Sequence, residues 1–218
     1  MTSFQNPPPA PAAPGAQRQP SDENDEASHK RQMRDLQTSM RAAMDAAREE
    51  RDLVIVNTGA GKGKSTAAFG MLVRNIGHGR RCVVVQFVKE GDHAIRKVLS
   101  GPLLQWHGAG GGFTWDTQDR NADIAAARAG WLAALDALRD PAVRFVLLDE
   151  LNIVLQCGYL PVDEVLDGLR SRAAGKHVVI TGRGAPPELV DFADLVTEMR
   201  EIKHPFNAGV RAQAGVEF

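Results

Sequence analysis

The sequence predicts an α/β protein whose doubly wound, mostly parallel sheet is covered by helices on both faces. Three observations support this prediction. Short and almost continuously apolar segments, such as Leu53–Val56 and Cys82–Val88, alternate with longer amphipathic segments, as in parallel sheets that are buried on both faces. The first apolar segment is followed at once by a glycine-rich loop and a helix-forming segment. With 43% hydrophobic residues, the 218-residue chain is also large enough for one full domain.

The composition narrows the choice of partners and compartment. A formal net charge of −1 argues against a broad electrostatic surface for nucleic acid or an anionic membrane. No apolar run has the length of a membrane span, and the polar N-terminus carries no apolar signal segment. Cys82 and Cys157 lie in apolar surroundings without the spacing of a metal or redox site. We therefore interpret them as reduced core thiols of a cytoplasmic protein.

The N-terminal region is expected to differ from the remainder of the chain. Residues 1–27 contain six of the twelve prolines, and we predict that this polar tail is disordered. Residues 28–51 follow a helical pattern, with an apolar stripe formed by Met33, Leu36, Met40 and Met44. This amphipathic helix either packs on its own domain or covers a ligand or a partner subunit, because methionine-rich faces adapt to irregular surfaces.

Residues 52–218 are predicted to form the α/β domain. Its helices are expected where apolar residues recur on one face, at Lys64–Ile76, Ala122–Arg139, Val162–Arg172 and Glu188–Phe192. Its strands are expected where the chain is continuously apolar, at Leu53–Val56, Cys82–Val88, Phe145–Asp149 and His177–Thr181. Further candidate strands are Leu103–His107 and Leu195–Met199.

The stretch TGAGKGKST is the strongest functional motif. A Walker A loop consists of Gly, four residues and then Gly-Lys-Ser/Thr; Gly63, Lys64 and Ser65 match its end, whereas Thr58 stands in place of the first glycine. The glycines allow backbone N–H groups to approach phosphate oxygens, with the N-terminus of a helix behind them. The ammonium of Lys64 would contact the phosphates, and Lys62 adds a second charge. We predict a phosphate site formed by Thr58, Gly59, Ala60, Gly61, Lys62, Gly63, Lys64, Ser65 and Thr66.

Two further sets of residues are expected at the same edge of the sheet. Asp149 and Glu150 end a buried strand, where ligands bind in open α/β sheets. Mg²⁺ bridging Ser65, phosphate and one carboxylate would relieve the repulsion between acidic groups and phosphate. Alternatively, Asp149 only caps the following helix. Arg183 lies in a glycine-flanked loop after another strand and could contact phosphate or ribose.

A glycine-rich stretch between His107 and Arg120 ends in two large aromatic residues, Phe113 and Trp115. Exposed aromatic side chains on a loop are costly unless they cover something. They either anchor the loop to the core or form a wall for a large, flat or apolar ligand. The domain has no Ser-His-Asp constellation and no histidines with metal-ligand spacing.

Several long motifs together resemble the ATP:corrinoid adenosyltransferases of cobalamin biosynthesis and corrinoid salvage. The resemblance covers residues from about 29 to 218, and its motifs are TGAGKGKSTAAFG, GGFTWDTQ, LLDELNIVLQCGYLP, VVITGRGAPPELVDFADLVTEMR and KHPFNAGVRAQAGVEF. It implies a P-loop fold of the RecA-like type. The implied reaction is attack of the Co(I) centre of a reduced corrinoid on the 5′-carbon of ATP, which releases inorganic triphosphate.

The resemblance also implies functions for single residues. Lys64 would stabilise the leaving triphosphate, and Ser65 and Glu150 would bind Mg²⁺. Arg74 matches an arginine that contacts the nucleotide. Phe113 and Trp115 match residues that displace the lower axial ligand of the corrinoid. Two positions depart from the family pattern, because Ala60 replaces a common Asn and Asn207 a frequent Asp.

The resemblance further implies a homodimer in which the helix of residues 28–51 closes over the corrinoid, and a flavoprotein reductant of the flavodoxin type. Two alternatives remain. The glycine-rich loop and the acidic pair alone would also suit a small-molecule kinase or a RecA-like ATPase. A non-catalytic corrinoid carrier or sensor would fit if Ala60 prevented productive nucleotide binding.

Overall fold

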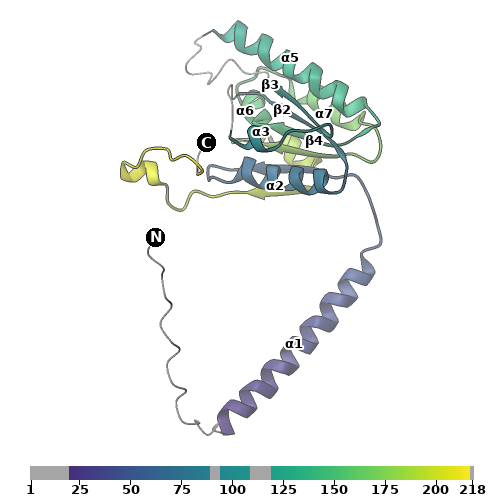
Figure 1. The fold of residues 1–218 in the computed structure, drawn as a ribbon, viewed down its shortest axis with the longest axis vertical. Helices are drawn as coiled ribbons and strands as arrows, with labels where there is room; N and C mark the ends of the chain where they lie inside the picture. Colours follow the sequence, from purple (N-terminus) through teal and green to yellow (C-terminus); the bar gives the residue numbers. More distant parts are fainter. Residues whose placement is uncertain (1–19, 89–93, 109–118, 217–218) are drawn as a thin grey trace, which may run out of the picture. The chain divides into compact units, whose positions relative to one another are not determined.

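The computed structural model describes residues 20–88, 94–108 and 119–216. The chain divides into two units, Met1–Glu50 and Arg51–Phe218, which are drawn in Figure 1. Among the described residues, no helix has the length and apolar character needed to cross a membrane.

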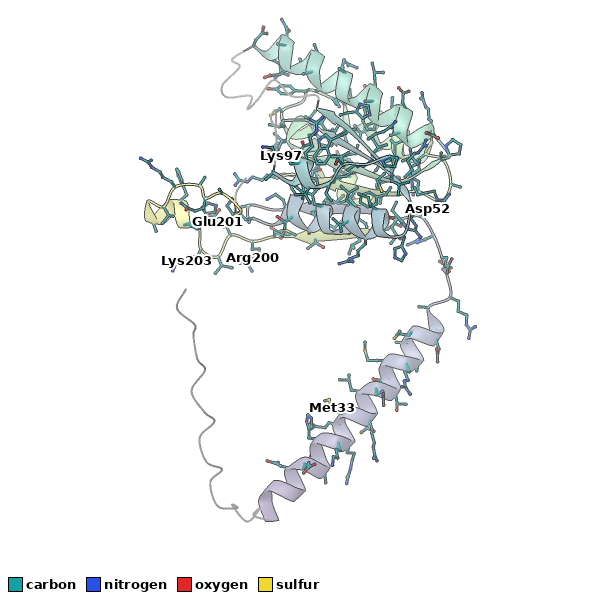
Figure 2. The ribbon with its side chains drawn as sticks, viewed as in Figure 1. Met33, Asp52, Lys97, Arg200, Glu201 and Lys203 are labelled. Carbon is teal, nitrogen blue, oxygen red and sulfur yellow. The ribbon has the colours of Figure 1, made fainter. Side chains whose placement is uncertain are left out.

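The first unit contains the helix α1 (Pro20–Ala46). It begins earlier than the predicted residue 28 and ends before residue 51, so residues 20–27 are helical where we predicted disorder. Proline at the first position favours helix initiation because its φ angle is already helical. An ion pair of 2.8 Å between Lys30 and Glu26, one turn apart, adds to the first turns. The stripe of Met33, Leu36, Met40 and Met44 is between 45% and 70% exposed, and Met33 is labelled in Figure 2.

The second unit is built on a sheet of six parallel strands. Their order across the sheet is β3-β2-β4-β5-β1-β6 (Figure 1), and every neighbouring pair is parallel. The strands are β1 (Val54–Thr58), β2 (Arg81–Gln86), β3 (Leu104–Gly108), β4 (Val143–Asp149), β5 (His177–Thr181) and β6 (Leu195–Glu198). The predicted parallel sheet is confirmed, including the two candidate strands at its edges.

Helices cover both faces of the sheet, which confirms the doubly wound architecture (Figure 1). One face packs against α2 (Lys64–Gly77) and α3 (Ala94–Val98), and the other against α5 (Arg120–Arg139), α6 (Leu151–Gln156), α7 (Val162–Arg170) and α8 (Pro187–Phe192). Alternate strand residues serve opposite faces: Leu147 joins the cluster around Phe69 of α2, and Leu148 joins the cluster around Trp131 of α5.

The sequence did not predict α3, α6 or the short 3₁₀ helix η1 (Pro205–Ala208).

Of the two cysteines, Cys82 is buried in the core, and its burial raises the pKa of the thiol to about 11. Cys157 is only partly buried, so the prediction of a core thiol holds for Cys82 alone.

Candidate active site

The predicted phosphate loop connects β1 to α2 at the carboxyl edge of the sheet. Gly63 precedes the first helical residue with a left-handed φ of 105°, and no side chain caps the helix. The N–H groups of the first turn of α2 therefore lie behind the loop, where an anion would meet the positive end of the helix dipole. Strand, loop and helix have the arrangement that a P-loop requires.

Two of the loop glycines are needed because another segment packs directly on the loop. Gly61 donates a hydrogen bond of 2.7 Å from its N–H to the carbonyl oxygen of Met199. A Cβ atom on Gly61 would come within 2.6 Å of the carbonyl oxygen of Arg200, and one on Gly59 would also meet the backbone of Met199. Larger residues would thus push this segment, which follows β6, away from the loop. Arg200, Glu201 and Lys203 continue it (Figure 2).

Lys64 lies over the loop. Its ammonium donates a hydrogen bond of 2.6 Å to the carbonyl oxygen of Gly61. Its carbonyl oxygen accepts one of 3.2 Å from the side chain of Asn57, at the end of β1. Lys62 and Ala60 are exposed in the same loop, and Ser65 is half-buried at the start of α2.

Thr58 has a partner outside the loop. Its hydroxyl oxygen accepts a hydrogen bond of 3.2 Å from the N–H of Ala185. Ala185 follows Arg183, so this bond joins the P-loop to the glycine-flanked loop after β5. The residue that departs from the Walker pattern thus connects two predicted parts of the site. Arg183 is exposed in that loop.

Arg74 is not brought to the loop within this chain. It lies in the last turn of α2, whereas the phosphate loop precedes the first turn. Ten residues of α-helix separate Arg74 from Lys64, which corresponds to about 15 Å along the axis. The resemblance to the family, which assigns Arg74 by its position along the sequence, does not show this separation.

Asp149 lies in a buried hydrogen-bonded network that crosses four strand ends. It is 1% exposed. Its Oδ1 accepts a 2.7 Å bond from the hydroxyl of Thr181, and its Oδ2 accepts a 3.0 Å bond from Nε2 of Gln86. Gln86 Oε1 in turn accepts a 3.0 Å bond from Nε1 of Trp106. Because the residue that precedes α6 is Glu150 and no side chain caps that helix, the interpretation of Asp149 as a helix cap is wrong.

Glu150 has an unusual backbone at the same edge. Its φ of 64° is the one positive value of a non-glycine residue in the described chain. Its N–H donates a 2.9 Å hydrogen bond to the hydroxyl of Thr181. Left-handed backbone in a non-glycine residue costs energy and is concentrated at functional sites. The backbone of Glu150 is therefore consistent with its prediction as a metal ligand.

The chemistry of the donors fits Mg²⁺, which prefers oxygen ligands and keeps several of them from phosphate and water. The hydroxyl of Ser65 and the carboxylate of Glu150 are such oxygens, at the helix start and strand end that face the same edge. Among the described residues no group of three His, Cys, Asp or Glu is placed to hold a metal ion. The phosphates would therefore have to complete the coordination.

Phe113 and Trp115 lie outside the described residues. The chain that carries them leaves β3 at Gly108 and enters α5 at Arg120. Asp119 caps α5, because its side chain accepts hydrogen bonds from the N–H groups of Asn121 and Ala122. The end of β3 belongs to the carboxyl edge that also carries the P-loop.

Several residues of this edge were not predicted as part of the site: Gln86, Trp106, Asn152, Thr181 and Met199. One signal was present, since Gln86 and Thr181 are polar residues at the ends of apolar strands. Their pairing depends on the register of the strands, which the sequence does not contain.

The parallel sheet and the strand–loop–helix unit define a P-loop protein of the α/β class. Residues 50–218 match the model of a family described as ATP:corrinoid adenosyltransferase BtuR/CobO/CobP. The chain belongs to this family, as the motifs predicted.

Curated relatives resemble the chain over most of its length. A corrinoid adenosyltransferase of Pseudomonas aeruginosa is 51% identical over 176 residues, which cover 79% of this chain and 86% of the relative. One of Sinorhizobium sp is 46% identical over 201 residues, with 90% and 94% covered. The corrinoid adenosyltransferase CobA of Salmonella typhimurium is 44% identical over 178 residues, with 81% and 91% covered.

Proposed function

We propose that the chain transfers the 5′-deoxyadenosyl group of ATP to the Co(I) centre of a reduced corrinoid, in adenosylcobalamin biosynthesis or corrinoid salvage. The observation that carries this proposal is that the P-loop lies within residues 50–218, which match the family model. In the proposed reaction the electron pair of Co(I) forms the bond to carbon 5′. The bond from that carbon to the triphosphate oxygen breaks, and its electron pair leaves with the triphosphate.

The protein groups of the loop suit this leaving group. Negative charge grows on the triphosphate as the carbon–oxygen bond breaks, and fixed positive groups stabilise such developing charge. Lys64 lies over the loop through its 2.6 Å bond to Gly61, and the start of α2 presents N–H groups behind it. Co(I) is itself a strong nucleophile, so the reaction requires no general base.

We propose Ser65 and Glu150 as the residues that hold Mg²⁺. Bound there with the phosphates, the ion would neutralise part of the charge of ATP. Lys62 and Arg183 are proposed as further contacts of the nucleotide, supported by their places in two loops at one sheet edge.

Phe113 and Trp115 are proposed to displace the lower axial ligand of the corrinoid. Removal of an axial donor makes reduction to Co(I) easier, because axial ligands strongly tune metal potentials. Support comes from the resemblance of GGFTWDTQ to the family motif and from the origin of this segment at the end of β3.

We further propose that α1 closes over the corrinoid, that the protein is a cytoplasmic homodimer and that a flavodoxin-like flavoprotein supplies the electrons. The exposed methionine stripe of α1 supports a covering function, since methionines adapt to large irregular ligands. Size-exclusion chromatography with light scattering tests the dimer.

Formation of the cobalt–carbon bond tests the proposed activity. The protein is incubated with ATP, Mg²⁺ and a corrinoid reduced chemically to Co(I), and the adenosylated product is followed by its absorption spectrum. Lys64→Ala should lower kcat/KM by about 100-fold, since one lost oxyanion donor costs about 3 kcal/mol. Corrinoid binding without any product in the unchanged chain would favour a carrier, and near-normal turnover of Lys64→Ala would remove Lys64 from this function.

A further inference from the structure

We propose that Thr58 is a positioning residue that fixes Arg183 beside the bound nucleotide. The inference rests on the proposed contact between Arg183 and the nucleotide and adds a residue that acts through it. It also explains why the glycine of the Walker pattern is replaced at this place, because glycine has no hydroxyl.

Three residues of the loop that carries Arg183 are attached by hydrogen bonds: Thr181, Gly182 and Ala185. At its start, the hydroxyl of Thr181 bonds to Asp149 at 2.7 Å. The carbonyl oxygen of Gly182 accepts a 3.0 Å bond from Nδ2 of Asn152, a residue of α6 without solvent exposure. At its end, the N–H of Ala185 donates to the hydroxyl of Thr58. The loop is thus held from both sides, by α6 and by the P-loop.

The two glycines of the loop show how closely it lies on α6. Gly182 and Gly184 have φ values of 129° and 65°, in the region that favours glycine. A Cβ atom on Gly182 would come within 2.9 Å of Cβ of Asn152, and one on Gly184 within 2.7 Å of the side chain of Gln156. A side chain at Gly182 would meet the start of α6, and one at Gly184 would be strained by its φ and would displace the end of the Gln156 side chain. Between these two glycines Arg183 is exposed.

Thr58 connects three segments of the edge. Its backbone ends β1 and begins the P-loop, and its carbonyl oxygen accepts a 2.9 Å bond from the N–H of Met199, after β6. Its side chain adds the bond to Ala185 at 3.2 Å. Loss of the hydroxyl would remove the bond that joins the Arg183 loop to the P-loop, and would leave the bonds of Thr181 to Asp149 and of Gly182 to Asn152.

The energetic consequence concerns the ordering of Arg183. A long side chain loses rotamer freedom when it binds a ligand, and a mobile backbone increases this cost. A loop held on both sides has lost that freedom before ATP arrives. Thr58 would therefore strengthen ATP binding without itself contacting the phosphates through its hydroxyl.

Calorimetric titration of the full chain with ATP and Mg²⁺, in the absence of corrinoid, tests this inference apart from turnover. Thr58→Val should weaken ATP binding about fivefold, the value of one neutral hydrogen bond, whereas Thr58→Ser should bind as the unchanged chain does. Thr58→Gly restores the Walker pattern and should nevertheless bind as weakly as Thr58→Val. Thr197→Val is the matched control, because Thr197 lies exposed on the neighbouring strand β6.

A double-mutant cycle with Arg183→Ala shows whether Thr58 acts through Arg183. The inference predicts that Thr58→Val has no further effect on ATP affinity in the Arg183→Ala background. In the chain that keeps Arg183, Thr58→Val should raise KM for ATP while kcat changes little. Additive losses, or ATP binding by Thr58→Gly that equals that of the unchanged chain, would overturn it. If Arg183→Ala alone binds ATP with normal affinity, Arg183 does not contact the nucleotide, and Thr58 cannot act through it. Absence of adenosylation would not affect the binding measurement.

Discussion

Thr181 joins the ends of strands β5 and β4, because its hydroxyl donates a 2.7 Å hydrogen bond to Oδ1 of Asp149. The hydroxyl oxygen of Thr181 also accepts a 2.9 Å hydrogen bond from the N–H of Glu150. One buried hydroxyl thereby satisfies a buried carboxylate and stabilises the left-handed backbone of the proposed Mg²⁺ ligand.

Thr181→Val removes both bonds while it keeps the shape of the side chain. We expect the free energy of unfolding to fall by about 2 kcal/mol, since the buried side chain of Asp149 loses one hydrogen bond and the part-buried N–H of Glu150 loses this acceptor. Urea unfolding of the full chain measures this change. Thr181→Ser, which retains the hydroxyl, is the control, and equal stability of the two variants would contradict the importance of the network.

Gly61→Ala tests the packing of the segment after β6 on the P-loop. The new methyl group would meet the carbonyl oxygens of Met199 and Arg200, and we expect a loss of about 1–3 kcal/mol in stability, as for other overpacked sites. ATP affinity should fall as well, because the loop must shift.

Gly70→Ala is the matched control for this substitution. A Cβ atom on Gly70 has no neighbour within 4 Å, and the residue lies inside α2. Alanine should therefore stabilise the protein by about 0.5–1 kcal/mol through its helix propensity. Identical thermal unfolding of the two variants would show that the contact with Met199 and Arg200 is not restrictive.

Lys176 should make stability depend on pH. The residue is fully buried, and its ammonium donates to the carbonyl oxygens of Asp140 and Val143. Burial lowers its pKa from 10.5 to about 8, and the positive charge of Arg144 lowers it further by a smaller amount. The attraction of Asp140 and Asp52 opposes this shift. Between these two values the unfolded chain binds the proton that the folded chain has lost, so stability should rise as the pH rises from about 8 to 10.5.

Lys176→Met should remove this part of the pH dependence. The measurement is the unfolding free energy of both chains at several pH values, compared by slope because the substitution also removes two hydrogen bonds. Parallel curves would contradict the lowered pKa.

Asp52, which precedes β1, marks the amino edge of the sheet in Figure 2. Lys176 directly precedes β5 at that same edge, so ATP affinity should change little.

Trp115→Ala should separate reduction of the corrinoid from transfer. If Trp115 displaces the lower axial ligand, its loss should reduce activity from Co(II) with a weak biological reductant far more than activity from preformed Co(I). Parallel assays with the two starting states measure the ratio. Equal losses would refute the proposed function of this aromatic residue.

The architecture could be predicted largely from local patterns. His177–Thr181 was predicted with its observed bounds, because an apolar strand between polar turns leaves little choice. Helix α6 was missed because Leu151–Gln156 is short, mostly apolar and separated from β4 by Glu150 alone, so that its pattern cannot be distinguished from that of a strand. The P-loop was predictable because its residues are adjacent in the sequence.

The connections within the site were not predictable in this way. The bonds from Thr58 to Ala185 and from Gly61 to Met199 join residues more than a hundred positions apart, and they depend on the order β5-β1-β6 in the sheet. For Arg74, which was assigned from its match along the sequence, the structure adds a position in the last turn of α2, about 15 Å along the helix axis from Lys64.

Phosphorus NMR of the products tests the central claim most directly, namely that the P-loop of Thr58–Thr66 holds a triphosphate that leaves intact. The protein is supplied with ATP, Mg²⁺ and a corrinoid reduced to Co(I), and the products are compared with a reaction that lacks corrinoid. We predict the signals of inorganic triphosphate in an amount equal to the adenosylated corrinoid. Release of ADP with phosphate, or with a phosphorylated acceptor, would contradict this account and indicate an ATPase or a kinase.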